Sequence, residues 1–509
     1  MTLQEKRRSY QPKYPKILRH LQEVVCKTDN AFPKVASDIG SLFPHLQKLP
    51  LSRILQGQPA RGRPLKVGVV FSGGPAAGGH NVLTGLFDAL QQIHPESELM
   101  GFVGGFEGLT AGQAKTLDAT KIDAVRNQGG FDLIGTGRTK LESEKDLETV
   151  HRVLKSFDAL IVIGGDDSNT NGAILAEYLL KQGSKTSVIG VPKTIDGDLR
   201  SAEIEMSFGF DSACKTYAEL IGNLCKDALS TRKYYHFIKL MGRSASHIAL
   251  ECALLTHPNF TIIGEERKSL ETLVREIADL IVKRKEIGKE FGVILIPEGV
   301  IEFIPDIEPL IKALSQGKLS AHEQTLWDRF PPKIQTQLLA SKDPHGNVKV
   351  SQIASNELIL ELVKKELLRR DSKDTTQFQE HFFGYEGRSC LPTNFDANYT
   401  YSLGVLSALA ARDQLTGVIV AIQSLHQHPD HWIPVIAPLV SLLHLEERLG
   451  IHKPVITKSL VDLKSPHYLH FCHFRNQWSI EDQYLVPGPI QFFGDVELTD
   501  SCPRILDPL

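Results

Sequence analysis

Three short loops in this 509-residue chain combine glycine, acidic and basic residues in patterns that suit phosphate chemistry. The first, residues 71–79 (FSGGPAAGG), follows an apolar run, and its glycines would let backbone N–H groups approach an anion closely. The alternative is a tight turn between a strand and a helix, and this loop alone leaves both readings open. It matches neither G-x-x-x-x-G-K-[ST] nor G-x-G-x-x-G, so it does not indicate a Walker A or dinucleotide-binding loop.

The other two loops carry carboxylates. Residues 164–168 (GGDDS) place two adjacent Asp side chains beside a glycine turn, which suits a hard cation such as Mg²⁺. Asp167 could instead cap the next helix, although capping explains two consecutive carboxylates less well. Residues 192–198 (PKTIDGD) combine a lysine, a hydroxyl and two carboxylates, enough to hold a phosphate and to accept a proton from an attacking hydroxyl. A surface turn is the alternative for this loop.

Further along the chain, charged side chains follow other apolar runs. They lie in residues 241–243 (MGR), 297–299 (PEG) and 385–388 (YEGR). Arginine binds phosphate oxygens in a bidentate manner, and glutamate can hold sugar hydroxyls. Each segment is ordinary by itself.

The elements that must position these loops are short, almost continuously apolar strands that alternate with helices. This pattern predicts mostly parallel sheets covered on both faces, with ligands beyond the carboxyl ends of the strands. The predicted strands are residues 65–71, 157–163, 187–191, 235–240, 291–296 and 417–422. The predicted helices include residues 81–90, 172–180 and 351–370.

The composition excludes several classes of protein. A formal net charge of −3 gives no general attraction to nucleic acid or to an anionic membrane, so neither is expected as a partner. The seven cysteines are dispersed without a C-x-x-C pair, which predicts reduced thiols and a cytoplasmic protein. The N-terminus has the pattern of neither a secretory signal nor a transit peptide, and no apolar run approaches the roughly 18 residues that span a bilayer.

Taken together, SGG, GGDD, PKTIDGD, MGR, PEG and YEGR resemble the phosphofructokinase family, whose members carry these segments in this order. The likeness covers roughly residues 65–450. It implies two doubly wound α/β domains with the active site in the cleft. It also implies transfer of a phosphoryl group to the 1-hydroxyl of fructose 6-phosphate, with Mg²⁺ as cofactor.

The resemblance assigns roles position by position. Asp196 corresponds to the base that takes the sugar's proton, Asp166 to the Mg²⁺ ligand, and Gly73 to a backbone contact with the phosphoryl donor. Arg138 corresponds to a residue that stabilises the charge on the transferred group. The implied sugar-phosphate contacts are Thr194, Ile195, Asp196, Lys233, Tyr234, Met241, Gly242, Arg243, Glu298, Tyr385, Glu386, Gly387 and Arg388.

Two positions in these motifs bear on the phosphoryl donor. ATP-dependent relatives typically carry glycine where this chain has Asp167 and where it has Lys193. A carboxylate at 167 would crowd and repel the α-phosphate of ATP, and Lys193 can neutralise a terminal diphosphate oxygen. Both differences indicate the diphosphate-dependent branch of the family, with Asp167 and Lys193 counted among the catalytic residues.

The oligomeric state remains open. Where ATP-dependent relatives place an arginine of the neighbouring subunit on the sugar 6-phosphate, this chain has Lys233 and Tyr234. We therefore expect these two side chains to act across a subunit interface. The sequence leaves open a homodimer and the catalytic subunit of a hetero-oligomer.

The expected domain organisation follows from the same pattern. Residues 1–60 are expected to form an N-terminal helical extension, because Ile17, Leu21 and Val24 have helical spacing. The remaining segments are a diphosphate- and Mg-binding domain at 61–206, a fructose-phosphate domain with interdomain segments at 207–304 and 381–450, a helical insertion at 305–380, and a C-terminal segment packed on the body at 451–509.

Three other functions fit the sequence less well. An ATP-dependent phosphofructokinase is disfavoured by Asp167 and Lys193, and a non-catalytic regulatory subunit by the intact GGDD and TIDGD segments. A dinucleotide-dependent dehydrogenase would need G-x-G-x-x-G. His80 is interpreted as a residue at the start of a helix, and residues 426–431 (HQHPDH) as a surface loop rather than a metal site.

Overall fold

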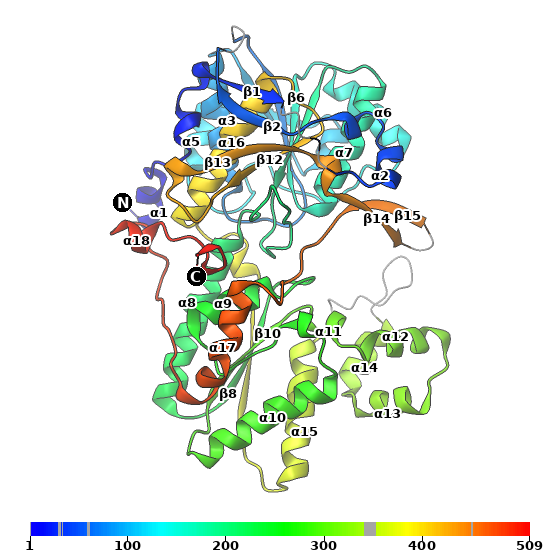
Figure 1. Ribbon diagram of the computed structural model, residues 1–509, viewed down its shortest axis with the longest axis vertical. Coiled ribbons are helices and arrows are strands. Elements are labelled where there is room, and N and C mark those ends of the chain that lie inside the picture. Colours follow the sequence, from blue (N-terminus) through cyan, green and yellow to red (C-terminus); the bar gives the residue numbers. More distant parts are fainter. Residues whose placement is uncertain are drawn as a thin grey trace.

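The computed structural model describes residues 2–28, 32, 34–58, 62–340, 353–448 and 451–508. These residues form two lobes stacked along the long axis of the molecule (Figure 1). The upper lobe is built on a nine-stranded sheet and the lower lobe on a four-stranded sheet. Each sheet carries helices on both faces, which confirms the predicted fold class.

The upper sheet has the strand order β1-β2-β13-β12-β7-β6-β3-β4-β5. Its central strands β12, β7, β6, β3 and β4 are mutually parallel, and antiparallel strands extend both edges. Strands β6 and β7 are buried along their whole length, which explains their continuous apolar sequences. The bounds are β1 Val24–Thr28, β2 Ser52–Gln56, β3 Lys66–Phe71, β4 Glu98–Phe102, β5 Ala114–Thr116, β6 Ala159–Gly164, β7 Ser187–Pro192, β12 Val418–Gln423 and β13 Ile433–Pro438.

Alternate residues of these strands pack into two different cores. Val69 and Ile161 join the core that contains helices α3 and α16, whereas Val70 and Val162 join the core that contains α6 and α7. The sheet therefore buries both faces, as the sequence pattern predicted. The helices of this lobe are α1 Leu3–Arg8, α2 Ser37–Leu42, α3 Gly79–Ile93, α4 Phe106–Thr110, α5 Ala119–Val125, α6 Glu144–Leu154, α7 Asp166–Lys181 and α16 Asn394–Arg412.

The lower sheet has the order β11-β8-β10-β9, and all of its pairs are parallel. Leu240 and Leu295 share a core with helices α8, α9 and α17, whereas Phe237 and Ile294 share one with α10 and α15. The strands are β8 Tyr235–Leu240, β9 Phe260–Thr261, β10 Gly292–Pro297 and β11 Phe378–Phe383. The helices are α8 Phe210–Thr231, α9 His247–Thr256, α10 Leu270–Glu286, α11 Val300–Phe303, α15 Ser355–Arg370 and α17 Pro466–Glu481.

All six strands predicted from the sequence are present. The expected organisation of two segments, residues 1–60 and 381–450, differs from the structure. The N-terminal region is not purely helical, because β1 and β2 pair with each other and β2 joins β13 at the edge of the upper sheet. Residues 381–450, grouped with the second domain and the interdomain segments, divide between the lobes. Strand β11 ends in the lower sheet at Phe383, and helix α16 then returns the chain to the upper lobe, where β12 pairs with β7.

Two further parts lie beside or between the sheets. Helices α12 Ile307–Gln316, α13 Ala321–Arg329 and α14 Pro332–Ala340 project from the side of the lower lobe (Figure 1). The helix predicted at 351–370 begins at Ser355, and residues 351–352 lie outside the described residues. The hairpin of β14 Leu443–Arg448 and β15 Ile451–Ile456 contacts α7, and residues 457–465 lead from it to α17. A short helix, α18 Val496–Thr499, follows near the C-terminus.

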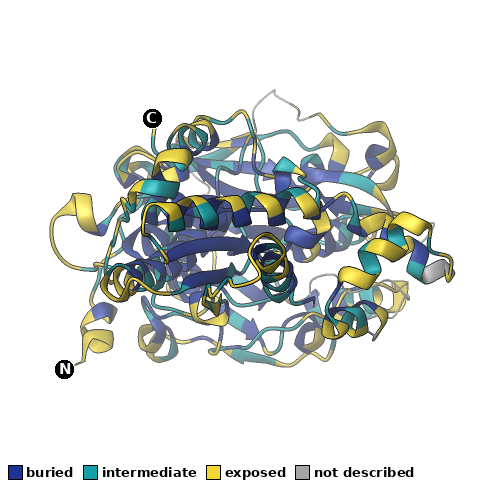
Figure 2. Cartoon of the chain, turned by 90° about the horizontal axis from the view of Figure 1, so that it is seen from below, coloured by how far each residue is buried: buried dark blue, intermediate teal, exposed yellow. Residues whose placement is uncertain are grey.

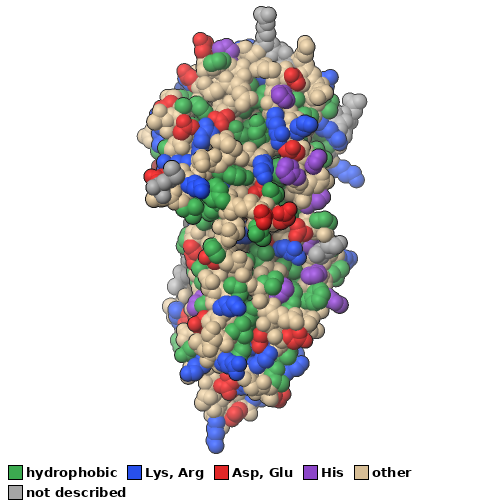
Figure 3. Space-filling model, turned by 90° about the vertical axis from the view of Figure 1, so that its left-hand side faces the viewer, with side chains coloured by type: hydrophobic (Ala, Val, Ile, Leu, Met, Phe, Trp, Pro, Cys, Tyr) green, Lys and Arg blue, Asp and Glu red, His purple; other side chains and the backbone are tan. Residues whose placement is uncertain are grey.

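The distribution of side chains agrees with this architecture. Figure 2 shows the strands as almost entirely buried, while the helices expose their outer faces. On the face drawn in Figure 3, acidic and basic side chains are interspersed rather than gathered by sign. None of the helices in the described parts of the chain is long and apolar enough to cross a membrane.

Candidate active site

Two adjoining cavities lie where the predicted motifs converge. The first, of about 230 Å³, is lined by the glycine loop, the 138–140 loop, the start of α7 and the end of β7. The second, of about 360 Å³, is lined by residues from both lobes. The residues common to both cavities are Gly74, Arg138, Lys193, Thr194, Asp196 and Arg243. A ligand in one cavity would therefore lie against a ligand in the other.

The glycine loop after β3 forms one wall of the first cavity. Gly73 has φ +83°, a backbone conformation that favours glycine, and its N–H donates to the Gly137 carbonyl at 2.8 Å. Because Gly73 has no side chain, this wall of the cavity stays open. A Cβ there would lie 3.2 Å from Lys193 Nζ, and one on Gly74 would lie 2.4 Å from Arg388 Nη2. Both glycines thus make room for cations. The expected backbone contact of Gly73 with a phosphoryl donor stays a prediction.

The adjacent carboxylates Asp166 and Asp167 begin helix α7. Gly165 is the N-cap residue and makes no side-chain capping bond, so capping does not account for either carboxylate. Asp167 is half-exposed and forms an ion pair of 3.0 Å with Lys140. Asp166 Oδ2 lies 3.8 Å from Lys458 Nζ. Both carboxylates line the first cavity at the positive end of the helix dipole.

Lys193 is a buried cation at the junction of the two cavities. Lys193 is only 6% exposed, and desolvation lowers the pKa of its ammonium to about 8. The positive charge of Arg388 acts in the same direction, while Asp196 and Asp166 oppose the shift. Because this ammonium has lost most of its hydration, a bound anion would stabilise its charged form strongly.

Two carboxylates of the same loop lie beside Lys193. Burial raises the pKa of Asp196, against the opposing charges of Arg243, Lys458 and Lys193. Burial, reinforced by the charge of Asp196, raises the pKa of Asp198 to about 7. Asp196 lines both cavities, whereas Asp198 lines only the first. Of these two carboxylates, Asp196 is therefore the one that a ligand in either cavity could contact.

The second cavity brings together most of the residues expected to contact a sugar phosphate. Besides the shared Thr194, Asp196 and Arg243, its lining includes Ile195, Met241, Glu298, Tyr385 and Arg388. Burial raises the pKa of Glu298, and its Oε2 has no hydrogen-bond partner within the described residues. The Arg388 guanidinium stacks over the Tyr385 ring at 5.0 Å. A carboxylate and three arginines, Arg138, Arg243 and Arg388, suit a ligand that carries both hydroxyls and a phosphate.

Three other expected residues shape this cavity without lining it. Gly242 has φ +125° in the turn after β8. Glu386 accepts a hydrogen bond from the Gly384 N–H at 3.1 Å. A Cβ on Gly387 would lie 2.6 Å from the Tyr217 ring, whose hydroxyl donates to the Gly384 carbonyl at 2.5 Å. These contacts fix the loop that carries Tyr385 and Arg388.

Lys233 and Tyr234 lie apart from both cavities of this chain. They connect α8 to β8, with Lys233 exposed and Tyr234 at φ +69°. A single chain thus leaves the second cavity without these two expected contacts.

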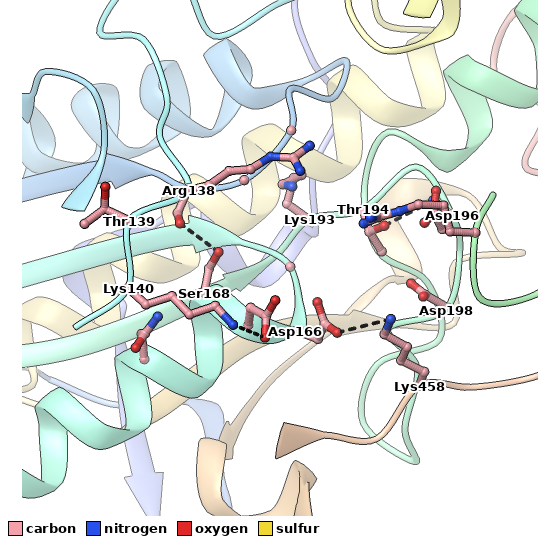
Figure 4. A pocket seen from close by; sticks show the side chains of 17 residues that line it. Arg138, Thr139, Lys140, Asp166, Ser168, Lys193, Thr194, Asp196, Asp198 and Lys458 are labelled. Atoms are coloured by element: carbon pink, nitrogen blue, oxygen red, sulfur yellow. Dashed lines mark hydrogen bonds and ion pairs between the residues drawn. The ribbon is translucent and has the colours of Figure 1, made fainter. Parts of the chain in front are cut away.

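Figure 4 also shows three lining residues to which the sequence motifs assign no role, Lys140, Asp198 and Lys458. Lys140 could have been found, since it follows Arg138 by two positions in the same loop. Asp198 is part of the PKTIDGD segment, but nothing in the segment distinguishes its role from that of Asp196. Lys458 follows no glycine turn and no predicted strand, and the sequence carries no local signal for it.

Comparisons with known proteins agree with this geometry. The family model described as phosphofructokinase matches residues 66–410. The chain is 43% identical to the pyrophosphate–fructose 6-phosphate 1-phosphotransferase of Treponema pallidum, over 98% of this chain and 95% of that relative. It is 43% identical to the beta 1 subunit of the Arabidopsis thaliana enzyme of the same name, over 94% of this chain and 89% of that relative.

Among solved structures, the pyrophosphate-dependent phosphofructokinase of Nitrosospira multiformis matches with a TM-score of 0.59 and 16% identity. The match covers 86% of this chain and 96% of that one, and it shows a common fold. The family match spans both lobes and every motif that lines the two cavities, and the relatives align over nearly the whole chain. The chain therefore belongs to the phosphofructokinase family.

Proposed function

We propose that this protein transfers a phosphoryl group reversibly from diphosphate to the 1-hydroxyl of fructose 6-phosphate. The products are fructose 1,6-bisphosphate and phosphate. The observation that carries the proposal is the junction of the two cavities, where Asp196, Lys193 and Arg138 would face both ligands. The names of the relatives support the same donor and acceptor.

The first cavity would hold diphosphate. Its cations are Arg138, Lys140, Lys193, Arg243 and Lys458, and the start of α7 adds the positive end of a helix dipole. Such a concentration of positive charge suits a small, highly charged anion. The second cavity would hold fructose 6-phosphate, with the carboxylate of Glu298 in its lining accepting from a sugar hydroxyl.

Asp166 fits a Mg²⁺ ion. Its carboxylate lines the first cavity and its side chain is 33% exposed, so an oxygen remains accessible to an ion that enters with the donor. Mg²⁺ is usually held by one or two carboxylates together with phosphate oxygens and water, and this cavity offers that combination. When bound, the ion supplies positive charge against the donor's phosphate oxygens.

The chemistry follows from the junction. Asp196 takes the proton of the sugar 1-hydroxyl while the oxygen of that hydroxyl attacks the nearer phosphorus of diphosphate. The new O–P bond forms while the bridging P–O bond breaks, and the remaining phosphate departs with the bridging oxygen. Arg138, Lys193 and Arg243, which line both cavities, would stabilise the charge on the group in transit.

Asp167 would select the donor. Its carboxylate lies in the first turn of α7 and forms an ion pair of 3.0 Å with Lys140, and we expect the α-phosphate of a nucleotide to extend toward it. A fixed negative charge there repels an α-phosphate. Lys193, buried beside Gly73, would neutralise the terminal oxygens of diphosphate instead.

A second subunit would complete the acceptor site through Lys233 and Tyr234. The exposure of Lys233 and its position outside the cavities of its own chain support this proposal. A homodimer is the simplest assembly. The plant relatives named as alpha and beta subunits make a hetero-oligomer the alternative.

A donor assay on the purified chain tests the function. Formation of fructose 1,6-bisphosphate should occur with diphosphate and not with ATP at equal concentration. Asp196→Asn keeps the size of the side chain and removes the base, so turnover should fall on the order of 10²–10⁴-fold. Preference for ATP, or no turnover with either donor, would overturn the proposal, and near-normal turnover of folded Asp196→Asn would remove this residue from its role.

A further inference from the structure

Lys458 extends into the first cavity from a segment to which no motif assigns a role. The segment, residues 457–465, crosses from the β14–β15 hairpin of the upper lobe to α17 of the lower lobe. Lys458 Nζ lies 3.8 Å from Asp166 Oδ2 and donates to Ser244 Oγ at 2.8 Å. In Figure 4 it approaches the cavity from the side opposite Arg138 and Lys193.

The backbone around Lys458 is fixed to the site. The Ser459 N–H donates to the Asp198 carbonyl at 2.7 Å, and the Val461 N–H donates to Glu265 Oε1 at 3.0 Å. Asp198 belongs to the loop that carries Asp196, and Glu265 belongs to the lower lobe. The position of Lys458 is thus set by bonds to the catalytic loop and to the second lobe, unlike that of a free surface lysine.

The contacts of the ammonium leave it able to bind a ligand. A lysine ammonium has three N–H donors, and Ser244 uses one of them. The distance of 3.8 Å to Asp166 is an ion pair but too long for a good hydrogen bond. Among the described residues, this leaves two donors for oxygen atoms that enter the cavity, at a side chain that is 40% exposed.

The carboxylates of the cavity make a cation on this side favourable for an anionic ligand. Asp166, Asp196 and Asp198 all feel the field of Lys458 or lie in contact with it. A polyanion approaching these carboxylates would be repelled unless a positive charge stood among them. Lys193 and Arg138 supply positive charge on the opposite side only.

We propose that Lys458 binds oxygen atoms of the diphosphate from the side opposite Lys193, so that residues 457–465 form part of the donor site. The inference rests on the proposed function, because it assumes diphosphate in the first cavity. It adds a specificity residue supplied by the segment that joins the two lobes. The same contact would hold the phosphate product, which is the substrate of the reverse reaction.

Lys458→Met tests the contact, with Lys458→Arg as the conservative variant. Lys464→Met is the matched control, since Lys464 is an exposed lysine of the same segment that lines neither cavity. Loss of a charge-assisted hydrogen bond should raise the KM for diphosphate, and that for phosphate in reverse, about 10- to 100-fold. The KM values for both sugar phosphates should change less than about twofold, and Lys458→Arg should recover most of the loss.

A binding measurement separates this inference from the proposed function. Isothermal titration of diphosphate into enzyme without sugar phosphate reports the contact whether or not turnover occurs, and Lys458→Met should weaken the Kd by the same factor as the KM. If the wild type is active and Lys458→Met has the same KM and Kd for diphosphate as Lys464→Met, the inference is overturned while the proposed function stands. So would a variant that changes only the Mg²⁺ concentration for half-maximal activity, because Lys458 would then act through Asp166. Wild type that neither binds nor uses diphosphate would overturn both proposals.

Discussion

The buried ammonium of Lys193 should set an alkaline limit to the use of diphosphate. Desolvation lowers its pKa to about 8, so the positive charge is present below that pH and is lost above it. Binding of the donor relies on the charged form. In the unliganded enzyme, about nine-tenths of the molecules therefore lack the charge at about pH 9. We therefore expect kcat/KM for diphosphate to be about tenfold lower at about pH 9 than at about pH 7.

The comparison with Lys193→Arg isolates the effect. Arginine keeps its charge throughout this range, so the variant should lose the alkaline decline, even if its overall rate is lower. Diphosphate and Mg²⁺ ionise or hydrolyse equally in both assays, so their contribution cancels in the ratio of the two profiles. Lys140→Arg, an exposed cation of the same cavity, is the matched control and should keep the wild-type profile.

The assay is kcat/KM for diphosphate at saturating fructose 6-phosphate and Mg²⁺, measured from about pH 6 to about pH 10. On the acid side, the rate should fall as Asp196 gains a proton, and the raised pKa of Asp196 places this fall above the usual range for an aspartate. A wild-type profile that stays flat beyond about pH 9, or the same alkaline decline in Lys193→Arg, would refute the assignment of that limit to Lys193.

Three other predictions concern the choice of donor, the metal and the subunit interface. Asp167→Gly should admit ATP weakly and reduce diphosphate use, whereas Lys193→Gly should help ATP only in the double variant. This coupling is measured as kcat/KM for both donors across the four proteins, and additive effects would contradict it. Asp166→Asn should raise the Mg²⁺ concentration for half-maximal activity and lower the rate, and full activity of wild type in excess chelator would contradict a metal role. An Asp196→Asn chain mixed with a Lys233→Ala chain should regain activity through one intact hybrid site, and no recovery after verified subunit exchange would place both residues within one chain.

The loops of the site could be predicted because each is marked locally. Residues 71–79, 164–168 and 192–198 directly follow strands β3, β6 and β7, and the carboxyl ends of adjacent parallel strands meet at one edge of a sheet. Their glycines and charges are readable within a few positions of a strand. Because β3, β6 and β7 are neighbours in the sheet, the three loops lie together, and no contact between distant segments has to be known to predict this.

What could not be predicted depends on contacts between distant segments. Strand β11 (FQEHFF) has no continuous apolar run, so its place in the lower sheet could not be read from the sequence, and helix α16 then carries the chain to β12 in the upper sheet. The apolar residues at 17–25 have helical spacing, yet the pairing of β1 with β2 overrides it. Lys458 reaches the cavity because a hairpin and α17 fix both ends of its segment in different lobes, which no window of sequence around it reports.

At the junction of the cavities, burial shifts the pKa values of both Lys193 and Asp196 in directions that favour the reaction. Burial weakens the hold of Lys193 on its proton and strengthens the hold of Asp196, since both charged forms lose hydration there. A more basic carboxylate accepts the sugar proton more readily near neutral pH, and a desolvated ammonium gains more from an anionic donor. The walls that cause this burial come from both lobes, with Arg243 and Glu298 on one and Gly74 and Arg138 on the other. Residues of both lobes therefore contribute to the surroundings in which the pKa values of Lys193 and Asp196 are shifted.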